Sequence, residues 1–522
     1  MLKGTTSQHT GGCGSAMDKF SVLSQYFGYS TFRQGQERLI DAILSGHDAL
    51  GVMPTGGGKS LCYQVPALLL PGVTLVISPL ISLMKDQVAA LNRAGVDAAF
   101  LNSSLTSEEQ FQVCRLARQG AYRLLYVAPE RLGAESFLAL VQGLDIALVA
   151  VDEAHCISQW GQDFRPSYLK IGDFLSALPR RPVVAAFTAT ATGEVQRDIV
   201  RLLGLRDPVC EVTGFDRPNL FFDVLRPADK LSTLLKLLRD RQGRSGIVYC
   251  ATRAGVDRVA AALEERGFPT ARYHAGMEDE ARRQNQDDFQ FDRKPVMVAT
   301  NAFGMGIDKS NVGFVVHYNM PKSLEAYYQE AGRAGRDGEP ADCILLWSPG
   351  DITTAMLLLE SGGNEELGEK TRELVRRQEF RRLDAIVGYC RTARCLRGYL
   401  LDYFGQDHLP ACGSCGNCRG EFRQEDVTTS AQMILSCVVR VRRHLGYSVG
   451  KSLILQTLRG SRDARVASLG LDRLSTYGLM ARLPTRQVRE LIDFLVLEGL
   501  LRVEPAHSTL APAGDAALVL RG

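Results

Sequence analysis

The stretch Met53-Pro-Thr-Gly-Gly-Gly-Lys-Ser60 is a glycine-rich turn that ends in a lysine and a serine. Three consecutive glycines carry no Cβ, so several backbone N–H groups can point into one phosphate-sized space. The apolar run before the turn (49–53) predicts a buried strand, and residues 61–70 after it predict a helix. Because a strand, a glycine turn and a helix N-terminus together bind anions, this stretch predicts an α/β fold that binds phosphate groups.

Two polar side chains close the turn. Lys59 is placed to reach the β- and γ-phosphates of a nucleotide, and the Ser60 hydroxyl is placed to ligate Mg²⁺. The usual first glycine of the G-x-x-x-x-G-K-[ST] pattern falls at Met53, so this stretch alone does not establish a phosphate loop. The residues that we expect to hold the phosphates are Thr55, Gly56, Gly57, Gly58, Lys59 and Ser60.

An acidic pair supplies the second piece of evidence. Asp152 and Glu153 follow the apolar run 146–151, so a strand would deliver Asp152 beside Mg²⁺, and Glu153 would act as general base on the attacking water. The alternative is an ordinary acidic turn after a strand, and the glycine turn upstream argues against it. His155 either bridges this segment to residues 188–191 or satisfies a backbone carbonyl. Together the two motifs indicate a nucleoside triphosphatase.

The composition is that of an ordinary globular protein of three or four domains, with 522 residues, 45% hydrophobic and 23% charged. The sequence has no run of eighteen apolar residues that would predict a membrane span, and its N-terminus has no signal peptide. Residues 1–16 are rich in Gly, Ser and Thr, so we expect them to be disordered, and Met17 could be the natural start. Thirteen cysteines without a secretory signal predict reduced thiols in a cytoplasmic protein.

Apolar strands alternate with helical patterns in two consecutive series, which is typical of two parallel α/β units in tandem. Only the first unit carries the glycine turn, so the second would supply residues across a shared nucleotide cleft. The net charge of +3 is concentrated at the C-terminus, where residues 427–522 hold thirteen Lys/Arg against seven Asp/Glu. The expected strands are 49–53, 74–78, 123–127, 147–151 and 183–187 in the first unit, and 246–250, 270–273, 296–299, 314–317 and 343–347 in the second.

A cysteine cluster follows a helical, arginine-dense stretch at 365–394. Cys395, Cys412, Cys415 and Cys418 have a spacing that lets four thiolates converge on one metal, and the glycines between them supply tight turns. Four cysteines fit a closed tetrahedral Zn²⁺ site, which has no open position for catalysis. Iron–sulfur clusters also use cysteine tetrads, so the spacing leaves both metals open.

Taken in order, the motifs resemble those of the RecQ family of superfamily 2 DNA helicases, from about residue 22 to the C-terminus. In that family the phosphate loop itself has the form M-P-T-G-G-G-K-S, so the missing first glycine favours this assignment. The motifs that carry the resemblance are Phe27-Gly28, Phe32-Arg33, Gln36-Glu37, 53–60, 78–86, 152–155, 188–191, 273–276, 303–307 and 328–336.

The resemblance implies an α/β fold of two tandem RecA-like parallel-sheet lobes, followed by a helical zinc-binding subdomain and a winged-helix (RQC) domain. The chain ends where many relatives continue into a further helical domain (HRDC), so we expect a bacterial type without that domain. The expected boundaries are 1–16 for the tail, 17–214 and 215–352 for the two lobes, 353–424 for the zinc-binding subdomain and 425–522 for the winged helix.

The resemblance also assigns roles around ATP. Tyr29, Arg33 and Gln36 would form an adenine pocket, in which Tyr29 stacks on the base and Gln36 hydrogen-bonds its edge. The alternative for these residues is a structural helix start. Arg333 and Arg336 would stabilise the transferred phosphoryl group, because a guanidinium stays protonated and can span two oxygens. The alternative for this pair is a surface salt bridge, and the sequence does not say which arginine touches the γ-phosphate.

On the DNA side, Trp160, Phe164 and Arg165 would belong to the aromatic-rich loop that couples single-strand binding to hydrolysis, since aromatic rings stack on bases without needing a particular sequence. Packing in the core is the alternative for Trp160. The resemblance selects zinc for the four cysteines. The C-terminal segment would bind duplex DNA through its basic charge, with residues 500–510 as the wing and His507 near its tip, or would instead bind another protein.

The implied function is that of an ATP-dependent DNA helicase, with 3′→5′ polarity, acting in DNA repair, recombination and the SOS response. Its cofactors would be ATP, Mg²⁺ and Zn²⁺, and its partners single-stranded DNA, duplex DNA and single-strand-binding protein, in a bacterial cytoplasm at the nucleoid and away from membranes. An RNA helicase is one alternative, against which the cysteine tetrad and winged helix argue. An ATP-switched annealing or scaffolding protein is the other, against which the intact catalytic set argues.

Overall fold

The computed structural model describes residues 17–304, 309–361, 368–420, 426–504 and 509–521. The chain divides into two compact units, Met1–Gly420 and Glu421–Gly522. The tail that we expect to be disordered (1–16) lies outside the described residues, as do 305–307 of the motif that begins at Phe303, and His507 of the expected wing. Among the helices of the described part, none is both long enough and apolar enough to cross a membrane.

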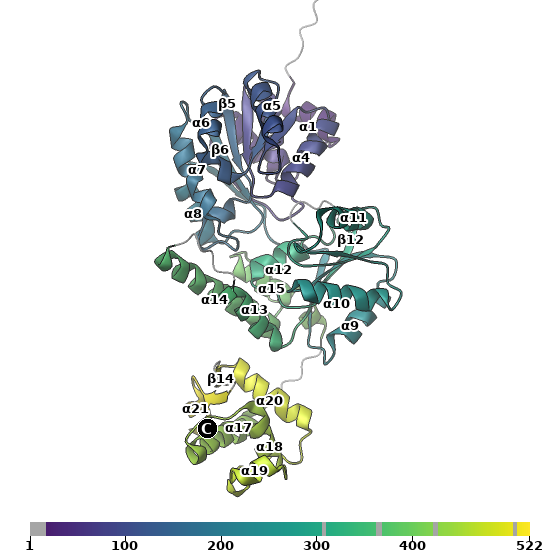
Figure 1. Cartoon of the computed structure of the whole chain (residues 1–522), viewed down its shortest axis with the longest axis vertical. Helices are drawn as coiled ribbons and strands as arrows, with labels where there is room; N and C mark the ends of the chain where they lie inside the picture. Colours follow the sequence, from purple (N-terminus) through teal and green to yellow (C-terminus); the bar gives the residue numbers. More distant parts are fainter. Residues whose placement is uncertain (1–16, 305–308, 362–367, 421–425, 505–508, 522) are drawn as a thin grey trace, which may run out of the picture. The chain divides into compact units, whose positions relative to one another are not determined.

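The first half of unit 1, which we call lobe 1, is drawn in purple and blue in Figure 1. It contains a seven-stranded parallel sheet with the strand order β3-β4-β2-β5-β6-β1-β7. The strands are β1 (Ala49–Val52), β2 (Val73–Ile77), β3 (Ala98–Leu101), β4 (Leu124–Val127), β5 (Ile146–Val151), β6 (Val183–Thr188) and β7 (Val209–Val212). The α-helices are α1 (Lys19–Phe27), α2 (Gln36–Leu44), α3 (Leu61–Leu69), α4 (Ile81–Arg93), α5 (Ser107–Arg118), α6 (Glu135–Val141), α7 (Pro166–Ala177) and α8 (Gly193–Leu202).

Helices cover both faces of this sheet, and the burial of β2 shows why. Leu75 and Ile77 belong to the core on one face, together with Phe174 of α7. Val76 lies between them in sequence but belongs to the core on the opposite face, together with Tyr63 of α3. Successive side chains of a strand point to opposite faces, so a strand that is buried on both is apolar throughout.

The second half of the α/β region, lobe 2, contains a six-stranded parallel sheet with the order β10-β11-β9-β12-β13-β8. Its strands are β8 (Leu220–Leu225), β9 (Ser245–Tyr249), β10 (Thr270–Tyr273), β11 (Val296–Ala299), β12 (Val312–His317) and β13 (Ala341–Leu346). Its helices are α9 (Lys230–Arg239), α10 (Arg253–Glu264), α11 (Asp279–Gln290) and α12 (Leu324–Ala331).

Unit 1 ends in helices, and unit 2 is a small helical fold with a two-stranded antiparallel sheet. A separate hydrophobic core fills unit 2, with Ile434, Val488 and Leu501 among its members. The helices that complete unit 1 are α13 (Gly350–Ser361), α14 (Glu369–Arg391), α15 (Leu396–Tyr403) and α16 (Gly416–Arg419). Unit 2 contains α17 (Thr428–Leu445), α18 (Lys451–Arg459), α19 (Ala464–Ser468), α20 (Thr485–Leu497), β14 (Leu501–Glu504), β15 (Thr509–Pro512) and α21 (Ala516–Arg521).

The predicted α/β fold class is confirmed, and each predicted strand is found within two residues of its expected position. Three strands were missed. β3 is short and two of its four residues are alanine, β7 is only partly buried, and β8 follows the link between the lobes. Short or half-exposed strands carry a weak apolar pattern, because packing rather than sequence determines them.

A buried carboxylate joins three strands of lobe 1. Asp48 directly precedes β1 and is 3% exposed. Its carboxylate pairs with Arg181 at 2.6 Å and accepts the N–H groups of Val184 at 2.9 Å and Arg206 at 2.7 Å. These contacts fix the start of β1 to β6 and to the turn before β7.

We therefore expect Asp48→Ala to lower the free energy of unfolding of lobe 1 by about 2–4 kcal/mol, since it leaves buried donors and a partly buried guanidinium without their acceptor. Urea denaturation of the full chain measures the change. Glu280→Ala is the control, because it removes the exposed ion pair between Glu280 and Arg283 and should leave the midpoint nearly unchanged. Equal midpoints for the two variants would contradict this role of Asp48.

Candidate functional site

The glycine-rich turn connects β1 to α3 and has the backbone of a phosphate loop. Gly56 (φ 83°) and Gly58 (φ 77°) lie in the left-handed region, and a Cβ on Gly58 would overlap the amide of Gln36. Within the described residues, no hydrogen bond uses the N–H groups of Gly58, Lys59 or Ser60. Ser60 is the N-cap of α3, and its hydroxyl makes no capping bond. Free N–H groups at a helix N-terminus fit an anion such as a nucleotide phosphate.

Residues upstream hold this turn by its carbonyl groups. The buried Gln36 donates its amide to Gly57 O at 3.2 Å and Gly58 O at 3.0 Å, and accepts the N–H of Arg33 at 2.8 Å. Arg33 Nη1 donates to Gly56 O. Tyr29, in contrast, is 53% exposed. The structure therefore places Arg33 and Gln36 against the phosphate loop, and it leaves the ring of Tyr29 open to stacking.

The acidic pair lies at the carboxyl end of β5. Asp152 donates its N–H to Ile77 O of β2 at 2.9 Å, and its carbonyl accepts from Tyr168 Oη at 2.8 Å. Burial and the neighbouring Glu153 raise the pKa of Asp152 to about 7, while Lys59 opposes the rise. Two buried carboxylates beside one lysine make a site that a divalent cation fits, since the cation would stabilise both charges.

Glu153 is strained. It has φ 46°, a left-handed conformation that residues with a Cβ rarely adopt. Its Oε2 lies 3.3 Å from His155 Nδ1 but makes no hydrogen bond in the described structure. His155 Nδ1 is instead 2.8 Å from Thr188 Oγ1, and burial lowers the pKa of His155, which favours the neutral imidazole. Of the two roles expected for His155, the structure shows the contact with the segment 188–191.

The two arginines of lobe 2 point to different places. Helix α12 ends at Ala331, before both of them, so they do not share a helical face. Arg333 is buried and donates Nη1 to Gly304 O within lobe 2. Arg336 reaches the phosphate loop instead, because a Cβ built on Gly56 would lie 3.4 Å from Arg336 Cγ.

A cavity of about 870 Å³ opens between the lobes. Glu153, His155 and Arg165 line it from lobe 1, and Thr300 and Arg333 line it from lobe 2. The predicted general base and one of the two predicted arginines therefore face the same space. Both lobes line this cavity, but among the described residues its lining includes neither the phosphate loop (53–60) nor Arg336, so the shared nucleotide cleft stays a prediction.

The aromatic-rich loop is anchored at its backbone. Trp160 is partly buried against the core of lobe 1, and its carbonyl and that of Gly161 accept from Arg382 Nη1 of α14 at 3.1 and 2.6 Å. Gln162 Nε2 donates to Gln329 Oε1 of α12 at 2.9 Å. The contact from Arg382 was missed, because a main-chain carbonyl leaves no mark in the sequence.

The remaining two predicted residues of this loop are Phe164 and Arg165. Phe164 is partly exposed. Arg165 Nη1 donates to Pro79 O at 3.0 Å, and its Nη2 pairs with Asp163 at 3.0 Å. The rings of Trp160 and Phe164 and the guanidinium of Arg165 are all partly exposed, and Arg165 connects the loop to the segment after β2.

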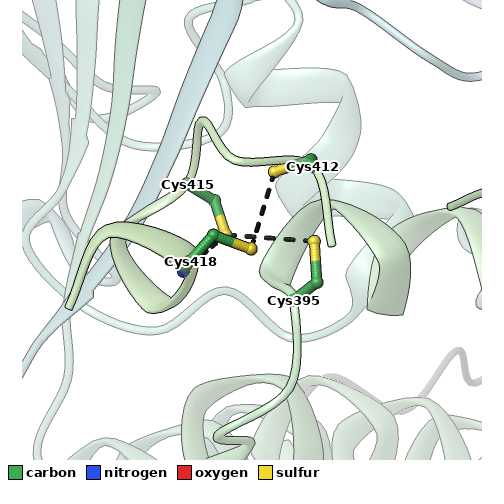
Figure 2. Close-up of side chains that lie close together, drawn as sticks. All are labelled: Cys395, Cys412, Cys415 and Cys418. Carbon is green, nitrogen blue, oxygen red and sulfur yellow. Dashed lines mark hydrogen bonds between the residues drawn. The ribbon is translucent and has the colours of Figure 1, made fainter. Parts of the chain in front are cut away.

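The four cysteines converge as predicted (Figure 2). Their Sγ atoms all lie within 4.8 Å of one another, with Cys395–Cys415 and Cys412–Cys418 both at 4.0 Å. With Zn–S bonds of about 2.3 Å, the sulfur atoms of a tetrahedral zinc site lie about 3.8 Å apart, so the cluster fits zinc closely.

The backbone supports thiolates at this cluster. The Sγ atoms accept N–H groups from Gly398, Ser414 and Cys418 at 3.3–3.4 Å. Burial would raise the pKa of Cys412, but hydrogen bonds from Ser414 and from the neighbouring Cys395 and Cys415 together outweigh it and lower that pKa to about 6. Burial raises the pKa of Cys395 and of Cys415, so the low pKa in this cluster belongs to Cys412. A thiolate is the form that binds metal.

Comparison with known families covers most of the chain. Four family models match in succession, described as DEAD/DEAH box helicase (33–199), Helicase conserved C-terminal domain (229–338), RecQ zinc-binding (349–419) and RQC domain (421–522). Among solved structures, the DEAD-box helicase Mss116 bound to ssRNA and UDP-BeF is similar, with a TM-score of 0.56 and 15% identity, over 74% of this chain and 90% of that chain. This likeness shows the fold alone.

Whole-chain relatives agree with the family models. The ATP-dependent DNA helicase RecQ of Bacillus subtilis is 44% identical over 504 residues, which cover 96% of this chain and 83% of that protein. The protein of the same name from Haemophilus influenzae is 41% identical, over 96% of this chain and 79% of its own length. With the two α/β lobes, the phosphate loop and the cysteine cluster in place, these matches show that the chain belongs to the RecQ family of ATP-dependent DNA helicases.

Proposed function

We propose that the protein moves 3′→5′ along single-stranded DNA and unwinds duplex DNA, driven by ATP hydrolysis at the interface of the two lobes, in DNA repair and recombination. The observation that supports this best is how near the side chain of Arg336 of lobe 2 comes to the phosphate loop of lobe 1, since a Cβ built on Gly56 would lie 3.4 Å from Arg336 Cγ. Because residues of both lobes would contact the nucleotide, its hydrolysis would change the contact between the lobes. Cycles of closing and opening could then move DNA across both lobes.

In this proposal each residue of lobe 1 has one task. Lys59 and the loop N–H groups bind the β- and γ-phosphates, and Ser60 and Asp152 hold Mg²⁺. Mg²⁺ bridges phosphate oxygens and neutralises their charge. Glu153 accepts a proton from the attacking water. The exposed Tyr29 would stack on adenine, at the edge of the loop that Gln36 holds.

Lobe 2 then supplies the charge that the transition state needs. Arg336 is the better candidate for the γ-phosphate, since its side chain already lies against Gly56. Arg333, which is held on Gly304 and lines the cavity beside Glu153, would support the same oxygens from the other side.

On the DNA side, we propose that Trp160 and Phe164 stack on bases of the single strand and that Arg165 contacts a phosphate. Unit 2 carries the basic excess and would hold the duplex. Single-strand-binding protein is a proposed partner, and the nucleoid of a bacterial cytoplasm is the proposed location. We also propose the domain boundaries given above, with lobe 1 ending near residue 214 and the zinc-binding subdomain beginning near 353.

Unwinding of tailed duplexes tests this function. We expect the wild type to separate a duplex with a 3′ single-stranded tail when ATP is present, and a 5′-tailed or RNA duplex poorly. Lys59→Ala should lower the rate of ATP hydrolysis by at least roughly 100-fold and abolish unwinding, because the γ-phosphate loses its cation, while DNA binding persists. The control is the exposed Lys170→Ala. Hydrolysis at the wild-type rate by Lys59→Ala would refute the phosphate-loop assignment.

For the metal site, we expect Cys412→Ser to lose bound zinc and to melt at a lower temperature, because three thiolates no longer close the tetrahedron. Elemental analysis of the purified chain gives the metal per protein and counts iron at the same time. Cys210→Ser, which changes an exposed cysteine outside the cluster, is the control. A full complement of zinc in Cys412→Ser, or iron in the wild type, would overturn the proposed ligand set.

Trp160→Ala should raise the DNA concentration needed for half-maximal ATPase stimulation roughly 5- to 150-fold, the equivalent of about 1–3 kcal/mol of base stacking. Titration with single-stranded DNA measures it, and Trp160→Phe should retain most of the response because it keeps a ring. If Trp160→Ala melts earlier but keeps the wild-type response to DNA, then Trp160 is a packing residue.

A further inference from the structure

The link between the lobes (213–219) contains an arginine that touches both of them. Arg217 Nη1 donates to Thr55 O of the phosphate loop at 3.3 Å, and also lies 3.5 Å from Gly332 O of lobe 2. Its Nη2 donates to Ala334 O at 3.1 Å and to Gly335 O at 2.8 Å. A single partly buried guanidinium thus spans main-chain carbonyls of the phosphate loop and of the segment that carries Arg333 and Arg336.

These two segments are also in direct contact where Arg217 bridges them. A Cβ on Gly332 would lie 3.7 Å from Thr55 Cβ, and a Cβ on Gly56 would lie 3.4 Å from Arg336 Cγ. Gly335 has φ 58°, so the chain turns sharply just before Arg336. The position of Arg336 over the loop therefore depends on how the carbonyls before it are held.

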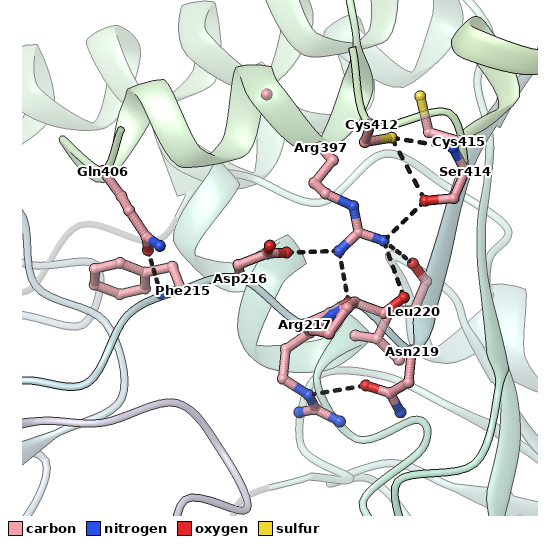
Figure 3. A network of polar contacts seen from close by, with 12 residues as sticks. Phe215, Asp216, Arg217, Asn219, Leu220, Arg397, Gln406, Cys412, Ser414 and Cys415 are labelled. Atoms are coloured by element: carbon pink, nitrogen blue, oxygen red, sulfur yellow. Dashed lines mark hydrogen bonds and ion pairs between the residues drawn. The ribbon is translucent and has the colours of Figure 1, made fainter. Parts of the chain in front are cut away.

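The link is itself fixed by the cysteine-bearing segment (Figure 3). Arg397 of α15 is 6% exposed, and its Nη1 donates to Arg217 O at 2.6 Å and pairs with Asp216 at 2.7 Å. The ring of Phe215 stacks on Phe404 with centroids 4.3 Å apart. Because the backbone of Arg217 is held on this side, its side chain has a fixed base from which to reach the two lobes.

We propose that Arg217 is a positioning residue for ATP hydrolysis: it fixes the segment 332–335 on Thr55, so that Arg336 lies over the phosphate loop. This inference rests on the role proposed above for Arg336. The contacts of Arg217 go to the loop's outer carbonyl and to lobe 2, not to the N–H groups that face the phosphates. Its loss should therefore slow hydrolysis while nucleotide still binds.

Lysine cannot replace this arginine. The guanidinium has five N–H donors in a planar fork and reaches carbonyls on two sides, whereas an ammonium is a compact charge at the end of a flexible chain. Arg217→Lys keeps the charge and most of the bulk but not the span. It is therefore the conservative variant for this test.

Arg244 provides a matched control. It also holds the chain around Arg336 by carbonyl groups, since its Nη2 donates to Gly313 O at 2.6 Å and Pro340 O at 2.8 Å, and its Nη1 pairs with Asp342 at 3.1 Å. All of these partners belong to lobe 2. Arg244→Ala thus loosens lobe 2 without touching the contact between lobes.

We expect Arg217→Ala and Arg217→Lys to lower kcat of the DNA-stimulated ATPase roughly 10- to 100-fold, as a misplacement of about 1 Å can do, with KM for ATP within about threefold. Arg244→Ala should keep kcat within about twofold. Melting temperatures of all variants are measured in parallel. The inference is overturned if Arg217→Lys folds and keeps the wild-type kcat. It is also overturned if Arg244→Ala lowers kcat as much as Arg217→Ala does.

A double variant tests whether Arg217 acts through Arg336. When Arg336→Ala has already removed the guanidinium proposed to contact the γ-phosphate, adding Arg217→Ala should change kcat by less than about twofold. Both substitutions then remove the same interaction, the one that Arg336 makes with the nucleotide. If the double variant instead loses kcat by the product of the two single losses, Arg217 acts independently of Arg336. That result would overturn the inference and would leave the proposed role of Arg336 intact. If Arg336→Ala alone keeps the wild-type rate, the proposed role of Arg336 fails instead, so the two failures are distinguishable.

Discussion

Two carboxylates, Asp152 and Glu153, lie adjacent and buried at the end of β5, and such a pair is unfavourable unless cations stand close to it. In lobe 1, the charge of Lys59 opposes the raised pKa of Asp152. Mg²⁺ and the two arginines of lobe 2 would supply the remaining positive charge. In the proposed mechanism, the negative charge of this pair is therefore balanced only when Mg²⁺ and lobe 2 add their positive charge to that of Lys59.

Arginines that bind main-chain carbonyls hold the segments around this site. Arg217 connects the link to both lobes, Arg397 fixes the link to the cysteine-bearing segment, and Arg382 holds the aromatic-rich loop on α14. A guanidinium stays charged at any physiological pH and offers several donors in one plane. The aromatic-rich loop and the link between the lobes are therefore held at their backbones. Neighbouring side chains remain available for the DNA and nucleotide contacts proposed above.

The sequence predicts those parts of the fold and site whose chemistry requires particular residues. Buried parallel strands must be apolar on both faces, and a phosphate loop must have glycine where φ is positive, as at Gly56 and Gly58. Four thiolates can converge only from suitable spacing. The separation of Arg333 from Arg336 could not be predicted in the same way, because it depends on the end of α12 and on the turn at Gly335.

The contacts of Gln36, Arg217 and Arg382 with main-chain carbonyls could not be predicted from the sequence either, for a general reason. Every residue has a carbonyl, so an acceptor of this kind carries no residue type, and only the folded chain brings it within reach. The strand β7 shows a related limit. It is half-exposed at the sheet edge, where its position is determined by pairing with β1 and not by an apolar run of its own.

At Glu153, the left-handed backbone lowers the stability of the fold, whereas the carboxylate is the group that the proposed reaction needs. Glycine adopts this conformation without strain, and asparagine or aspartate with little, so replacing Glu153 by one of them relaxes the turn after β5. Each of these replacements also removes the carboxylate or shortens its reach. If Glu153 is the general base proposed above, selection for thermal robustness alone would favour catalytically impaired chains at residue 153, and an engineering effort guided only by melting temperature would select the same substitutions.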